Sequence, residues 1–269
     1  MYLTAAQRSL LERFVNVCET GTPEGRYGAI SIYADGPHRI RQITYGRSQT
    51  TEYGNLRRLV RMYVAAGGLC SAALAPYADR VGSVALTDDQ NFRALLQQAG
   101  RRDPVMRTIQ DRFFDETYFQ PAMTWAGDNG FTLPLSALVI YDSFVHSGGI
   151  LWLLRQRFAE NPPLLGGDER AWVGAYVRVR DDWLRHHANA ILNKTVYRTQ
   201  ALMGTSRNRP CSPEPGLHLH KSSGPMGRPC AIRGSTGINA VPPSAGFVRR
   251  ARPGSARRSG RSPVRLRRR

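Results

Sequence analysis

The sequence predicts a mainly α-helical α+β domain with one small β-hairpin near its N-terminus. Apolar residues recur at helical spacing over most of residues 56–203, whereas residues 27–33 alternate like a strand and are rich in β-branched side chains. About 200 residues can bury a single core without disulfides or a metal. We therefore expect one domain over residues 1–204, followed by a segment of different character over residues 205–269.

The first predicted helix begins after Thr4, whose hydroxyl can cap it, and has one apolar face. Glu19 lies at its C-terminal end, just before Gly21 and Pro23, which end helices. A carboxylate is disfavoured at this negative end of the helix dipole, which tends to raise its pKa. Glu19 therefore suits a general acid, although a solvated glutamate at a helix end gives the same pattern.

A small hairpin is predicted next, with strands over residues 27–33 and 42–45. Asp35-Gly36 between them is a turn signal. The second candidate carboxylate, Asp35, thus lies at the turn of the hairpin. Taken alone, an aspartate in this place is simply a turn residue.

The rest of the domain is predicted to be helical, with starts marked by caps or by proline at the first position. These starts are Leu56, Leu69, a Thr87–Gln90 capping box, Asp103-Pro104 with a helix to about Gly127, Pro134 and Asp168. The segment after Pro134, LSALVIYDSFV, is almost wholly apolar. We expect this helix at the centre of the core.

Asp142 is the exception on this apolar helix. A buried carboxylate carries a desolvation penalty unless it is paired, so we expect an ion pair with arginine. The candidate partners lie towards the C-terminal end of the domain and are Arg178, Arg180, Arg185 and Arg198. Such a network can serve the fold alone, or it can hold a catalytic acid in position.

The positive charge of the chain is concentrated in its last quarter. The net charge is +18, but residues 1–204 carry 23 Lys and Arg against 19 Asp and Glu, and residues 205–269 carry 15 against one. Residues 205–269 are rich in Gly, Pro, Ser and Arg and show no periodicity, which is typical of disorder. Their Arg-rich end suits nucleic acid or an anionic surface. A shifted reading frame in a GC-rich gene yields the same residue types, so both interpretations stay open.

The sequence lacks the motifs that mark several common classes of protein. The four cysteines have no metal spacing, and a Cys18–Cys70 bridge is less expected than two buried thiols. There is no histidine pair at metal spacing, no Gly-rich phosphate loop and no GxSxG motif, so we infer no metal and no cofactor. The first residues do not resemble a signal peptide, and no window is apolar enough for a membrane span.

Two sequence blocks resemble the chitosanases of glycoside hydrolase family 46, within the lysozyme-like superfamily. The first, residues 18–55, holds Glu19, Asp35 and the ITYG turn at 43–46; the second, residues 116–149, holds YFQPA and, about twenty positions later, YDSFVH. The similarity covers roughly residues 5–203. It implies a two-lobed, mainly helical lysozyme-like fold with a small sheet beside the cleft, and an extracellular, inverting endo-hydrolase of a β-1,4-linked amino-sugar polymer.

The resemblance also implies residue roles. Glu19 is expected to be the general acid, Asp35 the general base and Thr44 the residue that positions the attacking water. The buried ion network is implied for Asp142, Arg180 and Arg198, and substrate contacts for Arg26 and Glu52. Two departures stand out: nine positions separate Asp35 from Thr44, more than in the family, and the second lobe lacks the family's final apolar segment.

The substrate and the function class have alternatives. Chitosan is a polycation, so its cleft should be acidic, yet residues 18–55 hold four acids and four arginines. Peptidoglycan or an N-acetylated glycan therefore stays open as the substrate. A non-catalytic domain that binds glycan or cell wall can use the same scaffold, and binding of nucleic acid would depend on residues 205–269 alone. We expect a monomer that acts on polysaccharide and does not bind membrane.

Overall fold

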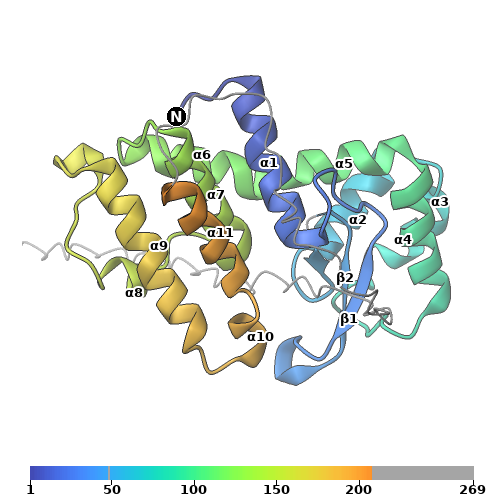
Figure 1. Ribbon diagram of the computed structural model, residues 1–269. Coiled ribbons are helices and arrows are strands. Elements are labelled where there is room, and N and C mark those ends of the chain that lie inside the picture. Colours follow the sequence, from blue (N-terminus) through green and yellow to red (C-terminus); the bar gives the residue numbers. More distant parts are fainter. Residues whose placement is uncertain (48, 208–269) are drawn as a thin grey trace, which may run out of the picture.

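A computed structural model of the chain describes residues 1–47 and 49–207, with side chains described as far as residue 204. It consists of two lobes on either side of helix α1 (Figure 1). One lobe contains the small sheet and helices α2 to α5, and the other contains α6 to α11. The mainly helical, two-lobed lysozyme-like fold expected from the sequence is confirmed.

Helix α1 (Ala5–Thr20) has the ends predicted for it. The Thr4 hydroxyl accepts the N–H of Gln7, the Gln7 side chain accepts the N–H of Thr4, and the two close a capping box. Gly21 ends the helix with φ 76°, a left-handed conformation that glycine adopts without steric cost. Leu11 and Val15 anchor the helix in the core, and this fixes the direction in which its last turn presents Glu19.

The sheet is antiparallel, in the order β1 (Ile30–Tyr33), β2 (Gln42–Tyr45) and β3 (Thr50–Thr51). The predicted second strand is confirmed, but the first was predicted three residues too long, and β3 was not predicted. Residues 27 and 28 lie outside the sheet because they cross helix α4, where a Cβ on Gly28 would lie 2.7 Å from Arg101 Cγ. Ala29 keeps one backbone hydrogen bond, accepted from Gly46 N–H at 2.8 Å. The close crossing places this segment along a cleft instead of in the sheet.

The helical region follows the predicted starts closely. Its elements are α2 (Leu56–Ala65), α3 (Ser71–Leu74), α4 (Gln90–Arg102), α5 (Pro104–Phe114), α6 (Gln120–Asp128), α7 (Pro134–Ser147), α8 (Trp152–Arg155), α9 (Glu169–Arg185), α10 (Ala190–Asn193) and α11 (Val196–Arg207). Short 3₁₀ turns lie at η1 (Pro37–Arg39), η2 (Ala75–Tyr77) and η4 (Pro163–Leu165). The predicted caps Asp103 and Asp168 accept backbone N–H groups of α5 and α9.

The predicted Thr87–Gln90 capping box is wrong. Helix α4 is capped by Asp89, whose carboxylate accepts the N–H of Phe92 at 2.9 Å. The Thr87 hydroxyl instead donates to the carbonyl of Arg41 at 3.0 Å. The Thr87 hydroxyl is therefore used by the residue just before β2 and not by the end of helix α4.

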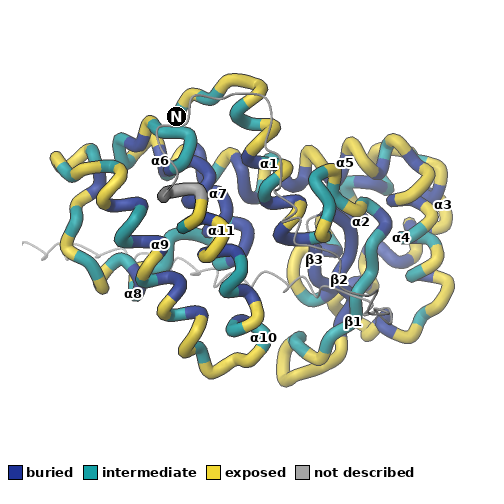
Figure 2. Tube along the Cα trace, in the orientation of Figure 1, coloured by how far each residue is buried: buried dark blue, intermediate teal, exposed yellow. Residues whose placement is uncertain are grey.

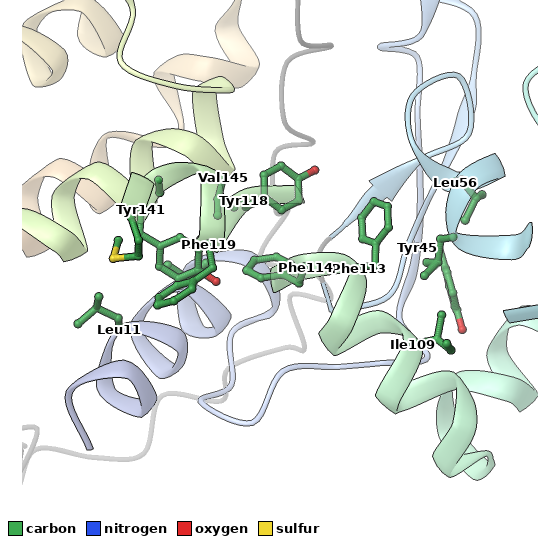
Figure 3. Close-up of a cluster of buried hydrophobic side chains, with 14 of the residues drawn as sticks. Leu11, Tyr45, Leu56, Ile109, Phe113, Phe114, Tyr118, Phe119, Tyr141 and Val145 are labelled. Atoms are coloured by element: carbon green, nitrogen blue, oxygen red, sulfur yellow. The ribbon is translucent and has the colours of Figure 1, made fainter. Parts of the chain in front are cut away.

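The helix predicted from Pro104 to about Gly127 is continuous in direction but changes its hydrogen bonding in the middle. Residues 115–119 form a π-helical turn, η3 (Asp115–Phe119), between α5 and α6. Pro121 follows it and has no N–H to donate, which favours a local change of hydrogen-bond register. Aromatic side chains of this run, including Phe114 and Phe119, pack edge to face on Tyr141 of α7 (Figure 3).

Helix α7 forms the buried centre of the second lobe, as predicted, with ten buried residues among its fourteen (Figure 2). Helices α9 and α11 pack side by side next to it. Cys18 and Cys70 are buried free thiols, so the favoured interpretation of these cysteines is confirmed. Helix α11 continues to Arg207, three residues past the predicted end of the domain, and the expectations for the rest of residues 205–269 lie outside the described part of the chain. Within that part, no helix is long and apolar enough to cross a membrane.

Candidate active site

A cleft of about 850 Å³ opens beside the C-terminal end of α1. The loop after α1 and the start of β1 form one wall, and the C-terminal end of α4 with the first turn of α5 forms the other. It is lined by residues 19–21, 24–31, 49, 97, 100–101 and 107. The cleft therefore brings together the end of α1, which carries Glu19, and the start of β1.

Glu19 lies in this wall with only 2% of its surface exposed. Its Oε1 accepts a hydrogen bond of 2.6 Å from Arg198 Nη1, while Oε2 is buried and has no partner among the described residues. Burial raises the pKa of this carboxyl, against the opposing effect of Arg198. The raised pKa expected from the helix end is thus present, but its main cause is desolvation, which the sequence position did not reveal.

Arg198 links Glu19 to a second buried carboxylate. Its Nε and Nη2 donate to Asp142 Oδ1 at 3.0 and 2.6 Å, and Arg180 Nη1 donates to Asp142 Oδ2 at 2.7 Å. Burial alone would raise the pKa of Asp142, but the attraction of Arg198 and Arg180 outweighs it and holds this pKa far below its usual range. Asp142 is therefore ionised, and both of its oxygens are occupied by arginine.

The four arginines considered from the sequence divide into two groups. Arg180 and Arg198 join the buried network. Arg185 instead pairs with Asp181 on its own helix, and Arg178 is exposed. Among the three on α9, only Arg180 lies on the face of this helix that meets α7, whereas Arg198 reaches the network from α11.

Asp35 lies on the sheet side, two residues after β1, and is half-buried. Its Oδ1 accepts a hydrogen bond of 2.9 Å from Gln42 Nε2, and its Oδ2 is buried without a partner in the described structure. Thr44, in the middle of β2, is fully buried and opposite Ser31, and its Oγ1 also lacks a partner there. Asp35 and Thr44 are not in the cleft lining itself, whereas Ser31 and Ile30 of β1 are.

The two residues expected to contact substrate differ in placement. Arg26 is exposed and lines the cleft. Glu52 is 1% exposed, and its carboxylate accepts the N–H groups of Ile43 at 3.1 Å and Leu86 at 2.6 Å. The structure therefore does not put Glu52 on the cleft surface; it gives this carboxylate a role in joining β2 to the segment before α4.

The opposite wall holds residues that sequence reasoning missed. Arg101 and Gln97 come from α4, and Arg107 comes from α5, where its guanidinium donates to the carbonyl of Arg101 at 2.5 Å. These residues form no local motif, and only the packing of α4 across Gly28 brings them to the cleft. Within the described residues, no cluster of His, Cys, Asp or Glu could hold a metal ion.

Comparisons of the sequence with known proteins give one family and one curated relative here. A family model described as glycosyl hydrolase family 46 matches residues 13–208. A chitosanase of Bacillus subtilis (strain 168) is 27% identical over 199 residues, which cover 70% of this chain and 70% of that protein.

Solved structures give the same result. A family 46 chitosanase of Gynuella sunshinyii in complex with chitotetraose superposes with a TM-score of 0.66 at 27% identity, covering 76% of this chain and 90% of that one. The native chitosanase of Bacillus subtilis MY002 gives a TM-score of 0.66 at 25% identity, with the same coverage. A mutant of the latter was solved with six GlcN units. The resemblance drawn from the sequence is thereby confirmed, and the chain belongs to glycosyl hydrolase family 46.

Proposed function

We propose that this chain is an endo-acting chitosanase that cleaves the β-1,4 bonds of chitosan with inversion at the anomeric carbon. The named relatives support the substrate class, since they are chitosanases and two of their structures hold chitotetraose or six GlcN units. Glu19 is the general acid, Asp35 is the general base, and Thr44 positions the water. Arg198, Asp142 and Arg180 hold the acid in place.

One observation carries the residue assignment. Glu19 Oε2, Asp35 Oδ2 and Thr44 Oγ1 are among the buried polar atoms without a hydrogen-bond partner in the described structure, as are Ser136 Oγ and Tyr141 Oη outside the cleft lining. A buried acceptor that stays unpaired costs about 1–3 kcal/mol, so such atoms are rare unless a ligand or water completes them. The three residues assigned to the reaction therefore each keep one oxygen available for the substrate or the water.

The acid step depends on Glu19 holding a proton at the pH of catalysis. Burial favours the neutral carboxyl, and Oε1 stays fixed by Arg198, so Oε2 carries the proton towards the glycosidic oxygen. As the C1–O bond breaks, this proton goes to the departing oxygen and leaves a free 4-hydroxyl. The negative charge that Glu19 then acquires is stabilised by the Arg198 guanidinium.

The base step takes place on the opposite face of the sugar. Asp35 Oδ2 removes a proton from a water molecule, Thr44 Oγ1 holds the same water, and the water oxygen bonds to the anomeric carbon. Inversion needs room for that water, which in such enzymes corresponds to about 6.5–9.5 Å between the two carboxyl groups. The product is a reducing end of inverted configuration.

A second candidate substrate is favoured by the charge of the cleft. Its lining holds Arg26, Arg101 and Arg107 against Glu19 and Glu24. A fully deacetylated, cationic chain is repelled by such a wall, whereas N-acetylated or carboxylate-bearing sugars are not. Peptidoglycan or a partly acetylated chitosan is therefore the alternative.

The test is a reducing-end assay on chitosan, chitin oligomers and peptidoglycan, with the anomer of the first product followed by NMR. We expect the wild type to release reducing ends from chitosan, with the α-anomer formed first. The Glu19→Gln variant should release none. Exclusive release from peptidoglycan would favour the alternative substrate. Binding without any hydrolysis would overturn the enzymatic proposal in favour of a glycan-binding domain.

A further inference from the structure

Asp35 is held by one neighbour that no sequence pattern singled out. Gln42, the first residue of β2, is 5% exposed and donates Nε2 to Asp35 Oδ1 at 2.9 Å. Its Oε1 accepts the backbone N–H of Tyr53 at 3.3 Å. We propose that Gln42 is the positioning residue of the general base: it selects the oxygen of Asp35 that acts on water and fixes the plane of the carboxylate. This inference rests on the proposed role of Asp35.

The two partners of Gln42 fix the orientation of its amide. A backbone N–H can only donate, so the carbonyl oxygen of the side chain must face Tyr53. The NH₂ group then faces Asp35, where it donates to the carboxylate. Both hydrogen bonds of the Gln42 side chain therefore have one possible direction, and its NH₂ group is held on the Asp35 side.

The same contact leaves a single oxygen for chemistry. Oδ1 is occupied by Gln42, and Oδ2 is buried without a partner in the part of the chain that the structure describes. A proton taken from water therefore goes to Oδ2. Without Gln42 the carboxylate could rotate about its terminal bond and present either oxygen, and the geometry of the attack would be lost in part.

Gln42 is itself firmly placed, which a positioning residue requires. It pairs with Tyr33 in the register of β1 and β2, and the next residue, Ile43, donates its N–H to the buried Glu52 carboxylate. Asp35, in contrast, lies in the bend between β1 and the 3₁₀ turn η1. The hydrogen bond from Gln42 thus joins a residue in a bend to the rigid strand beside it.

The decisive variant is Gln42→Glu, which keeps the acceptor for Tyr53 but puts a second carboxyl against Asp35. Two carboxylate oxygens at this separation must share a proton, so the pKa of the pair rises. We expect the acid limb of the pH profile of kcat/KM to move to higher pH by about one unit or more. The inference is overturned if the pH profile of the variant superimposes on that of the wild type. It is also overturned if kcat/KM falls by the same factor at every pH.

A second variant and a matched control separate positioning from folding. Gln42→Met keeps the length of the side chain and removes both hydrogen bonds; we expect kcat to fall on the order of tenfold with KM unchanged. Gln120→Glu is the control, because Gln120 also donates to an aspartate, Asp115 at 2.5 Å, on an exposed turn away from the cleft. It should leave the pH profile unchanged, and a shift there equal to that of Gln42→Glu overturns the inference.

The proposed function and this inference can fail separately. Asp35→Asn is assayed alongside the Gln42 variants on the same substrate. If Asp35→Asn retains the wild-type rate, the assignment of the general base is wrong and the role of Gln42 falls with it. If Asp35→Asn is inactive while both Gln42 variants behave as the wild type, only the role of Gln42 is wrong.

Discussion

Arg198 Nη1 donates to Glu19 Oε1 at 2.6 Å, across 179 positions of sequence and with both side chains almost fully buried. The same guanidinium also donates to Asp142, so one arginine contacts two carboxyl groups for which we propose different roles. Burial raises the pKa of Glu19, while the two arginines keep that of Asp142 low. The network thus separates a carboxyl that can give up a proton from a carboxylate that stays charged.

The Glu19→Gln variant should lose activity without losing its fold. Glutamine can keep the contact with Arg198 through its carbonyl oxygen but has no acidic proton, so we expect kcat to fall by about 10²–10⁴-fold. The measurement is the initial rate of reducing-end release, beside thermal unfolding of the same samples. Glu12→Gln, on the same helix but outside the cleft lining, should retain full activity. Wild-type turnover by Glu19→Gln would show that another group supplies the proton.

The stability difference between Glu19→Gln and the wild type should depend on pH in a defined direction. Burial raises the pKa of Glu19 in the folded state above its usual value of 4.5. Below pH 4.5 the carboxyl is neutral in the folded and unfolded states, and as the pH rises towards the folded-state pKa the wild type loses stability. The free energy of unfolding of Glu19→Gln relative to the wild type should therefore increase with pH across this window. Urea unfolding at a series of pH values measures it, and a difference that stays flat or decreases would contradict a raised pKa.

Asp142→Ala should unfold the domain more readily than any exposed aspartate variant. Removing this carboxylate leaves Arg180 and the second contact of Arg198 buried without a counter-charge, a change that costs about 3–5 kcal/mol. The free energy of unfolding in urea gives the value directly. Asp182→Ala, an exposed residue on α9 that pairs with Arg157 and His186, is the control and should cost less than about 1 kcal/mol. Equal losses from the two variants would show that the buried network contributes no special stability.

Glu52→Gln tests whether this residue serves the fold or the substrate. Its two oxygens accept the N–H groups of Ile43 and Leu86, and an amide NH₂ cannot replace one of these acceptors. We expect a loss of about 1–3 kcal/mol in unfolding free energy with KM unchanged. Glu116→Gln, on the exposed side of η3, is the matched control for stability. A raised KM with unchanged stability would restore Glu52 as a substrate contact.

Arg101→Ala should improve the use of a cationic substrate. Arg101 is exposed in the cleft wall, and removing its charge lowers the repulsion of chitosan. We expect KM for fully deacetylated chitosan to fall about two- to threefold at low salt and the effect to vanish at high salt. Arg102 is an exposed neighbour outside the cleft lining, so Arg102→Ala should change neither KM for chitosan nor its dependence on salt. A higher KM for Arg101→Ala would instead make Arg101 a direct contact of the substrate.

The sequence predicted those features that depend on local rules. The caps at Thr4, Asp103 and Asp168, the end at Gly21 and the strand β2 follow from residues within one turn of each position. The pairing of Asp142 with arginine followed from the cost of burying a charge. The resemblance then identified which two of the four arginines take part, and the structure agrees.

The features that were missed depend on contacts between distant segments. Thr87 has the spacing of a cap, but its hydroxyl is used by Arg41, which is far away in the sequence. The strand at residues 27–33 is shortened because Gly28 crosses α4. The burial of Glu52 and the contact of Gln42 with Asp35 likewise arise only once the hairpin is packed. Periodicity and caps carry no information about such partners.

Because Glu19 belongs to the first helix and Arg198 to the last one described, the counter-ion of the acid is synthesised long after the acid itself. A nascent chain or a proteolytic fragment that stops before α11 has Glu19 and the cleft wall but no guanidinium to balance the buried charge. If Glu19 is the proton donor as proposed, activity therefore requires that the chain has been translated past residue 198.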